Sequence, residues 1–223
     1  MTPPVITSLM FAALVSTSSV TAGSDAPSAP FINATFKSVV AEWTAALRAQ
    51  GKTFNPPRLL LLRTPPGHPA HGSAYAPGVG LVIDLTDVEG VNGVFGEEAR
   101  PFVALMIAHE VGHHVQRQLD SNFPEGDNTE RSLHERQADC YAGWWLAAAN
   151  RRSLSVSGSP AFAVPDLDRR LPRILNLLAV LESGRMAAAA ESQQHGSAGQ
   201  RVAALRRGLA SKSVDACGRE NLS

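Results

Sequence analysis

Residues 104–116, ALMIAHEVGHHVQ, place three histidines and a glutamate inside a largely apolar run. The first histidine, His109, is followed at once by Glu110 and four positions later by His113, which is the pattern HExxH. On an α-helix, residues i and i+4 lie on one face, so both imidazoles can bind a single metal ion. Glu110 lies beside that ion rather than on it, where a base that acts on water is needed. The pattern therefore predicts a zinc-dependent hydrolytic site.

A catalytic zinc site needs a third protein ligand and one open coordination position. The extended pattern HExxHxxGxxH would supply a third histidine, but Gln116 and Leu119 occupy the places of its glycine and last histidine. Glu135, in the stretch ERQAD, is the better candidate and completes a His₂Glu set. Asp139 follows four residues later on the same helix face, where it can accept the free N–H of a ligand histidine and fix its tautomer. The alternative for residues 135–139 is a solvated helix face with incidental charges.

The other histidines have separate interpretations. His114 follows a ligand by one position and so points about 100° away on a helix, toward the surface or the rim of the site. His134 likewise lies off the face of the third ligand. His68 and His71 form HxxH in a loop rich in glycine and proline, which favours solvated side chains over a second metal site. His195 opens HGSAGQRVAAL, a loop that runs into a helix and can deliver a side chain to a cleft formed elsewhere.

Hydrophobic periodicity predicts the elements that must position these residues. Helices are expected over residues 36–47, 101–119, 129–150, 166–183 and 197–210, and strands over 58–63 and 79–85. Residues 68–78 are loop-like, and residues 87–100, which contain Gly90, Gly93 and Gly96, are expected to form a connection. The fold class is therefore α+β, with a small sheet packed on the HExxH helix and a mainly helical C-terminal half.

Length and charge limit the classes of function. At 223 residues and 44% hydrophobic, the chain can bury one substantial core. Its 20 basic residues are balanced by 20 acidic residues, so no nucleic-acid partner is expected. The mildly basic last segment is diluted by Asp215 and Glu220.

The N-terminus has the layout of a secretory signal, with a short apolar core at 9–15 and small residues at 20–22. No Lys or Arg precedes the core, which is too short to span a bilayer unaided, so no stable membrane span is expected. We expect a signal peptide over 1–22, a disordered linker over 23–35 and one zinc metallopeptidase domain over 36–223. The protein would then be exported, either secreted or retained in the cell envelope. A disordered cytosolic tail is the alternative.

The chain contains two cysteines, Cys140 and Cys217. An oxidising compartment would permit a disulfide between them that closes a long loop. The alternative is one buried thiol and one incidental thiol, and the sequence leaves both open.

Together these motifs resemble the bacterial predicted neutral zinc metallopeptidases, a family of exported or membrane-anchored proteins. Four stretches carry the resemblance in the family's order, from about residue 36 onward: GKTFNPPRLLLLR, IDLTD with IAHEVGHHVQ, ERQADCYAGWW and HGSAGQRVAALRRGLASKSVDAC. The resemblance implies a zincin-like fold and a thermolysin-like (gluzincin) site with one zinc ion per chain. His109, His113 and Glu135 would be its ligands and Glu110 its base.

The segment that begins at His195 is also similar to the His-Pro…Arg segment of membrane-linked gluzincin peptidases. By that similarity, His195 would face the metal and stabilise the oxyanion, with Tyr75 as the reserve donor. Arg201 would anchor the segment.

The chain departs from the family's pattern in one loop. Family members often carry two cysteines that bracket it, where this chain has Pro66 and Ala76. Both cysteines, and with them a disulfide at this loop, are therefore missing here. Their loss affects the rigidity of the loop but does not change the metal ligands. The N-terminal region is also shorter than in members with a clear membrane anchor, which favours release over anchoring.

The expected function is a zinc-dependent peptidase, an endopeptidase that cleaves peptide or protein substrates by Glu-assisted attack of zinc-bound water. The strand at 79–85, if it lies at a sheet edge, can pair with an extended substrate backbone. The alternative is a zinc-stabilised, exported binding or scaffold protein without hydrolytic activity, in which Glu110 would be dispensable. An interaction module without metal ranks last, because both helical pairs would then be accidental. The sequence does not indicate an oligomeric state.

Overall fold

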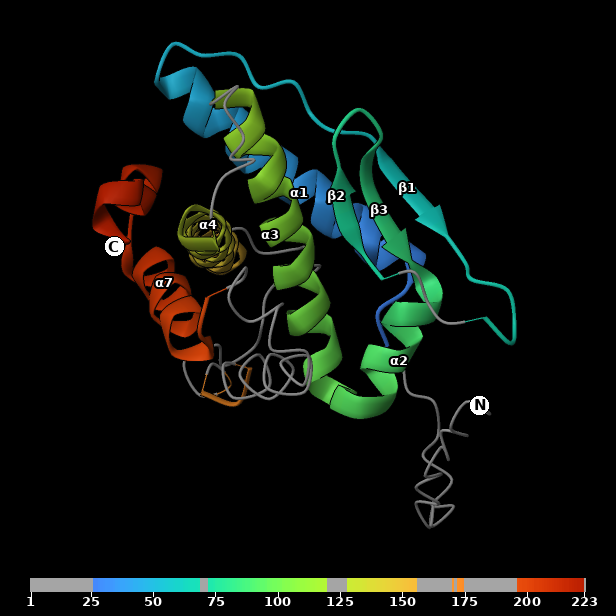
Figure 1. Ribbon diagram of the computed structural model, residues 1–223. Helices are drawn as coiled ribbons and strands as arrows, with labels where there is room; N and C mark the ends of the chain where they lie inside the picture. Colours follow the sequence, from blue (N-terminus) through green and yellow to red (C-terminus); the bar gives the residue numbers. More distant parts are fainter. Residues whose placement is uncertain are drawn as a thin grey trace, which may run out of the picture.

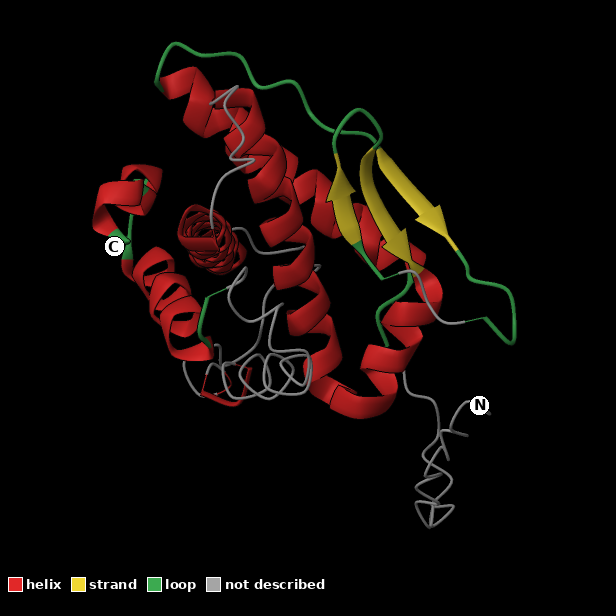
Figure 2. Cartoon of the chain, in the orientation of Figure 1, coloured by secondary structure: helices red, strands yellow, loops and turns green. Residues whose placement is uncertain are grey.

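A computed structural model describes residues 26–68, 72–119, 128–155, 170, 172–174 and 196–222. The fold is mixed α and β, mostly helical with one small sheet (Figures 1 and 2), so the predicted α+β class is confirmed. The expected signal peptide lies outside the described residues, as does most of the helix expected at 166–183. Within the described part of the chain, no helix is both long enough and apolar enough to cross a membrane. In chain order, the elements are α1 (Ala29–Ala49), β1 (Leu59–Leu62), β2 (Ala74–Ala76), β3 (Gly80–Asp84), α2 (Leu85–Phe95), η1 (Gly96–Glu98), α3 (Ala99–Leu119), α4 (Asn128–Ser155), α7 (Ala198–Ala210), η2 (Val214–Cys217) and η3 (Arg219–Asn221).

Helix α1 begins earlier than the periodicity predicted. Ser28 caps it by accepting a hydrogen bond from the Phe31 N–H, and a proline fits its first turn. Phe31 and Ile32 are buried in the core, so this first turn packs as firmly as the rest of the helix. The disordered linker expected over residues 23–35 is therefore wrong from residue 29 onward.

The sheet has the strand order β1-β3-β2, with β1 parallel and β2 antiparallel to β3. The condition set for strand 79–85, that it lies at a sheet edge, is not met, because β3 is central and its Leu81 and Ile83 are fully buried. The edge strand that contacts α3 is β2, which lies inside the segment interpreted as a loop. It has three residues with exposed or half-buried side chains, too few for an alternating pattern to appear.

Residues 85–98 form α2 and the short η1 turn instead of the expected connection. Asp84 caps α2, and the helix buries Val88 and Phe95 against the core. A Cβ at Gly90 or Gly93 would meet nothing within 4 Å, so both glycines lie on the open face of the helix. Burial of the opposite face offsets their low helix propensity of about 1 kcal/mol each.

Helix α3 lies at the centre of the fold, with the sheet on one side, α4 on the other and α7 beyond α4 (Figure 1). Apolar side chains from three helices meet in the core. Trp43 of α1 packs edge-to-face on Tyr141 of α4, with ring centroids 4.8 Å apart. Ile107 and Val111 of α3 are fully buried between them and the sheet.

Two glycines bring the backbones of α4 and α7 into direct contact. A Cβ at Gly143 would lie 2.2 Å from the carbonyl oxygen of Leu205, and one at Gly208 would lie 2.0 Å from that of Cys140. Any side chain at either position would push the helices apart. This close crossing fixes the position of α7, and with it that of Arg201, relative to α4.

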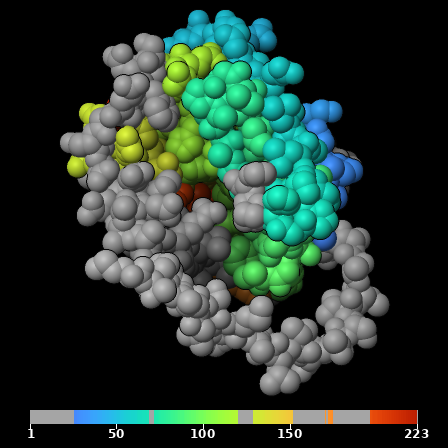
Figure 3. All heavy atoms as spheres, turned by 45° about the vertical axis from the view of Figure 1, so that its right-hand side comes forward, coloured from blue at the N-terminus to red at the C-terminus, as the bar shows by residue number. Residues whose placement is uncertain are grey.

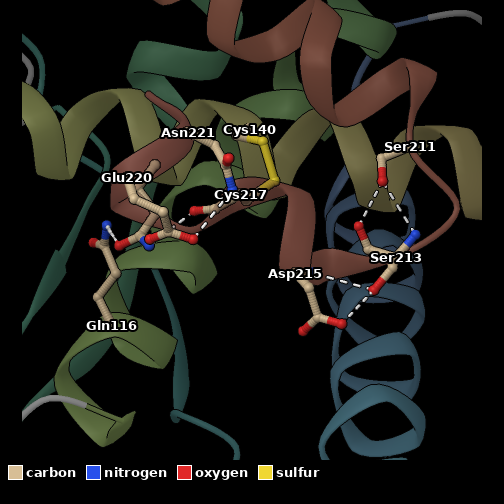
Figure 4. The surroundings of a disulfide bond; sticks show 9 residues. Gln116, Cys140, Ser211, Ser213, Asp215, Cys217, Glu220 and Asn221 are labelled. Carbon is tan, nitrogen blue, oxygen red and sulfur yellow. Dashed lines mark hydrogen bonds between the residues drawn. A yellow bond between two sulfur atoms is a disulfide. The ribbon is translucent and has the colours of Figure 1, made fainter. Parts of the chain in front are cut away.

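The residues that follow α7 are tied to α4. Cys140 in α4 and Cys217 in η2 form a disulfide, the first of the two alternatives that the sequence left open (Figure 4). The Gln137 side-chain amide donates to the Cys217 carbonyl at 2.9 Å, and Arg136 donates to the Leu222 carbonyl. We refer to residues 211–222 as the C-terminal segment.

Candidate metal centre

Helices α3 and α4 bring three potential ligands to one point. The Nε2 atoms of His109 and His113 are 3.0 Å apart, and each lies 3.4 Å from a carboxylate oxygen of Glu135. All three side chains are mostly buried, with exposures of 12–16%. Among the described residues, this is the one group of three or more His, Cys, Asp or Glu side chains with metal-binding geometry.

These spacings fit a tetrahedral zinc ion. Ligand atoms placed about 2.0–2.2 Å from such an ion are about 3.3–3.6 Å from one another. The three observed separations, 3.0, 3.4 and 3.4 Å, lie close to that value. Two imidazoles and one carboxylate are also a donor set that catalytic zinc sites use.

Gly112, between the two histidines, allows α4 to approach. A Cβ at this position would lie 3.3 Å from the Ala138 Cα, closer than most real contacts. Because α4 packs this tightly on α3, two side chains near Ala138 reach the histidines of α3. They belong to Glu135 and Asp139.

Asp139 orients His109. The Asp139 Oδ1 lies 2.9 Å from the His109 Nδ1, so it accepts this N–H and leaves Nε2 for a metal. Arg201 donates to both oxygens of Asp139, at 2.7 and 2.9 Å, in a bidentate pair. Asp139 thus lies behind a ligand, and Arg201 lies behind Asp139.

This arrangement shifts the pKa values of His109 and Asp139. Burial lowers the pKa of His109, but the carboxylates of Asp139 and Glu135 outweigh burial and raise it to about 10. Burial likewise raises the pKa of Asp139, but Arg201 and His109 outweigh it and hold that pKa below its usual value. Asp139 is therefore a permanent anion beside His109.

His113 has a different partner, Gln116. Its Nδ1 lies 2.9 Å from the Gln116 Oε1. Gln116 is not a ligand but contacts one, a role that the sequence analysis did not assign to it. Residues three apart on a helix are neighbours, so its spacing from His113 is the signal that could have identified it.

Glu110 contacts the edge of the sheet. Its Oε2 accepts a hydrogen bond from the Tyr75 main-chain N–H of β2 at 2.7 Å. The Tyr75 hydroxyl lies 3.2 Å from the His114 Nδ1, and the His114 Nε2 lies 2.6 Å from the Asn55 carbonyl oxygen. Because a carbonyl only accepts, Nε2 carries the proton and Nδ1 accepts from the tyrosine hydroxyl. His114 thus lies at the rim, as expected, and holds the strand that contacts Glu110.

The remaining histidines do not join the site in the described structure. His134 is buried in α4 and contacts Arg219 of η3. His68 is exposed on the surface. His71 and His195 lie outside the described residues, so the role expected of His195 stays a prediction.

Figure 3 shows one face of the molecule. There, atoms of the sheet segments, α3 and α4 share one surface, and atoms of the C-terminal part of the chain are visible between them. The candidate metal centre is thus built from α3 and α4 and lies beside the edge of the sheet.

A family model described as "Putative neutral zinc metallopeptidase" matches residues 8–219. The chain belongs to this family. The match includes His109, His113 and Glu135 as well as Arg201, so all residues of the candidate centre lie within the family's region. The resemblance inferred from the sequence motifs is thereby confirmed.

Relatives of the chain have been found in enterobacteria and mycobacteria. It is 33% identical over 136 residues to "Uncharacterized protein YpfJ" of Escherichia coli strain K12, a match that covers 52% of this chain and 46% of that protein. It is 32% identical over 119 residues to "Uncharacterized protein Mb2605" of Mycobacterium bovis, covering 48% and 40% respectively. The chain therefore spans less than half the length of these curated relatives. No solved structure matches the chain at a significant level.

Proposed function

We propose that this member of the zinc metallopeptidase family is a zinc-dependent endopeptidase with one zinc ion per chain. The observation that carries the proposal is the convergence of His109, His113 and Glu135 at tetrahedral spacing. Glu110, on the same helix turn, is not part of that set and remains available as a base. Its carboxylate also accepts the Tyr75 N–H, and it lies beside the ligands, where a hydrolytic site needs a base.

Bound zinc would polarise the scissile carbonyl and lower the pKa of a water molecule to about 7. Glu110 would remove a proton from the attacking water and later deliver it to the leaving amine. The Tyr75 N–H holds one oxygen of Glu110, which fixes the carboxylate in one orientation. Asp139 and Gln116 would hold the two imidazoles through their Nδ1 atoms.

Strand β2 is suited to bind the substrate. In its antiparallel pairing with β3, Tyr75 is opposite Leu81, yet its N–H donates to Glu110 rather than to β3. The main-chain groups of Tyr75 therefore face away from β3, toward the site. An extended substrate backbone could pair along this outer edge, which favours cleavage within a chain and weak dependence on side chains.

His195 is the first candidate for stabilising the oxyanion beside the metal, as the sequence similarity implies. Tyr75 is less suited to that task, because its hydroxyl donates to His114. Gly196, the residue that follows His195, has a φ of 80° and lies against Ser132 in the first turns of α4. Ser132 precedes Glu135 by one helical turn, so the segment runs alongside the ligand-bearing helix.

We further propose that the protein is exported, with residues 1–22 as its signal peptide. The disulfide between Cys140 and Cys217 supports this location, because such bonds persist in oxidising compartments. The balanced charge of the chain gives no reason to expect a nucleic-acid partner.

Metal analysis combined with a peptide library tests the proposal. Purified protein should contain about one zinc per chain and cleave an unstructured protein or a broad peptide library. The variant Glu110→Gln can still accept the Tyr75 N–H, so it should retain zinc while cleavage falls by about 10²-fold or more. A protein that binds zinc but cleaves nothing would favour the scaffold alternative, and a protein without zinc affinity would refute both.

A further inference from the structure

We infer that Gln116 is the positioning residue for His113. The inference rests on the proposed zinc site but not on peptidase activity. It assigns a function to a side chain that is neither a ligand nor a base.

Two main-chain carbonyls determine the direction of every hydrogen bond in this network. The Gln116 Nε2 lies 2.8 Å from the His134 carbonyl oxygen, which can only accept, so Oε1 is the acceptor that faces His113. The His113 Nδ1 must then carry the proton, at 2.9 Å from that oxygen. Its Nε2 is consequently unprotonated in the neutral ring, which is the form that binds a metal.

Gln137 extends the network to the disulfide. The Gln116 Nε2 also donates to the Gln137 Oε1 at 3.0 Å, and the Gln137 Nε2 donates to the Cys217 carbonyl at 2.9 Å. Cys217 is bonded covalently to Cys140. Figure 4 shows Gln116 directed toward the turn that carries Cys217 and Glu220.

Both amides are buried, with exposures of 4% for Gln116 and 8% for Gln137. At these buried positions, water does not readily replace a lost hydrogen-bond partner. Rotation of either amide would therefore leave a polar group without a hydrogen bond. The network therefore has one arrangement, and in that arrangement His113 presents Nε2 to the metal.

Zinc affinity, measured by competition with a chelator on the full chain, tests the inference. Gln116→Leu removes the acceptor and should weaken zinc binding by about 10- to 100-fold. Gln116→Glu loses both donor bonds but keeps an acceptor for His113, so it should bind zinc clearly more tightly than Gln116→Leu. Gln118→Leu is the matched control. Gln118 lies on the same helix but contacts Thr53 and Asn55, and its loss should leave zinc affinity unchanged.

The outcomes separate this inference from the proposed function. If wild-type protein does not bind zinc, the proposed function fails and the inference fails with it. If wild type binds zinc and Gln116→Leu binds it equally well, the inference alone is overturned. Equal losses in the Leu and Glu variants would show that Gln116 only supports packing, which also overturns it.

A measurement on unmodified protein covers the case in which a variant does not fold. Nitrogen NMR of the zinc-loaded wild type distinguishes a protonated Nδ1 from a metal-bound one. The inference requires a proton on the Nδ1 of His113. Coordination through that nitrogen would overturn it.

Discussion

His109 and His113 present the same atom to the same point, but their outer nitrogens have different partners. Asp139, a carboxylate held by Arg201, accepts from His109, whereas the neutral amide of Gln116 accepts from His113. A carboxylate partner makes an imidazole a stronger base and a tighter ligand than an amide does. The two histidines should therefore contribute unequally to metal binding.

Asp139→Asn should weaken zinc binding by about 10- to 100-fold, because the amide retains the shape of the side chain without its charge. It also removes the carboxylate that Arg201 contacts at 2.7 Å, while Glu135 remains 3.9 Å from Arg201. Chelator competition measures the effect. Asp215→Asn, an exposed change in the C-terminal segment, is the control and should have no effect. Equal affinities in wild type and Asp139→Asn would contradict the role assigned to Asp139.

The raised pKa of His109 predicts that zinc binding releases a proton. In metal-free protein at about pH 8, a histidine with a pKa of about 10 is protonated, and zinc must displace that proton from Nε2. Titration calorimetry at about pH 8, repeated in buffers of different ionisation enthalpy, should report at least one proton released per zinc, and more where a zinc-bound water also ionises. Release close to zero would contradict the prediction.

The same shift predicts how the stability of the metal-free protein depends on pH. A pKa raised from 6.5 to about 10 adds stability that is fully present below pH 6.5 and is lost as the pH rises toward 10. The free energy of unfolding should therefore fall between about pH 7 and pH 10, and urea titrations can measure it. Asp139→Asn should flatten this slope, whereas a slope that is unchanged in the variant would assign the effect to other groups.

The three helices of the site are held together at glycines. Gly112 lets α4 approach α3, and Gly143 and Gly208 let α7 approach α4. The contact at Gly112 determines the distance from Glu135 to the histidines. The contacts between α4 and α7 determine the distance from Arg201 to Asp139. The geometry of the centre thus depends on positions that carry no chemistry of their own.

Gly208→Ala should destabilise the protein by about 3 kcal/mol or more, because the new methyl group would lie 2.0 Å from the Cys140 carbonyl oxygen. Urea unfolding measures the change. Gly199→Ala in the first turn of α7 is the matched control: its nearest neighbour, the Ser197 Oγ, is 4.0 Å away, so stability should be unchanged or slightly increased. Similar effects of the two variants would contradict the close crossing.

The sequence predicted the long elements better than the short ones. Helices α3, α4 and α7 each repeat an apolar pattern over several turns, and their predicted ends agree with the structure within a few residues, except at the C-terminal end of α4. Strand β2 has three residues, too few to show an alternating apolar pattern. Helix α2 contains two glycines, and only the burial of its apolar face offsets their low helix propensity. Both were therefore missed.

The same contrast applies to the candidate centre. Regular i, i+4 spacing was enough to propose the pairs His109/His113 and Glu135/Asp139, because helix geometry is local. Gln116 lies three residues from His113, but the direction of its amide depends on Gln137, a partner on another helix. No sequence spacing shows that two such residues meet.

The disulfide joins the middle of the chain covalently to its C-terminal part. Its cysteines are separated by 77 residues, for which loop entropy predicts a stabilisation of about 4 kcal/mol. The double variant Cys140→Ala/Cys217→Ala should lose about this amount in urea unfolding without zinc. A loss below about 1 kcal/mol would mean that the unfolded chain is already restricted in this region.

The crossing of α4 and α7 also has a consequence for the order of events during synthesis. The ribosome makes the histidines of α3 and the carboxylates of α4 first, and Arg201 follows 62 residues after Asp139. Until α7 has been made and has packed on Gly143, Asp139 lacks the cation that holds it, and Cys140 lacks its partner. The growing chain therefore carries an incomplete centre from the synthesis of α4 onward, and the centre is complete only once α7 and the C-terminal segment have packed on α4.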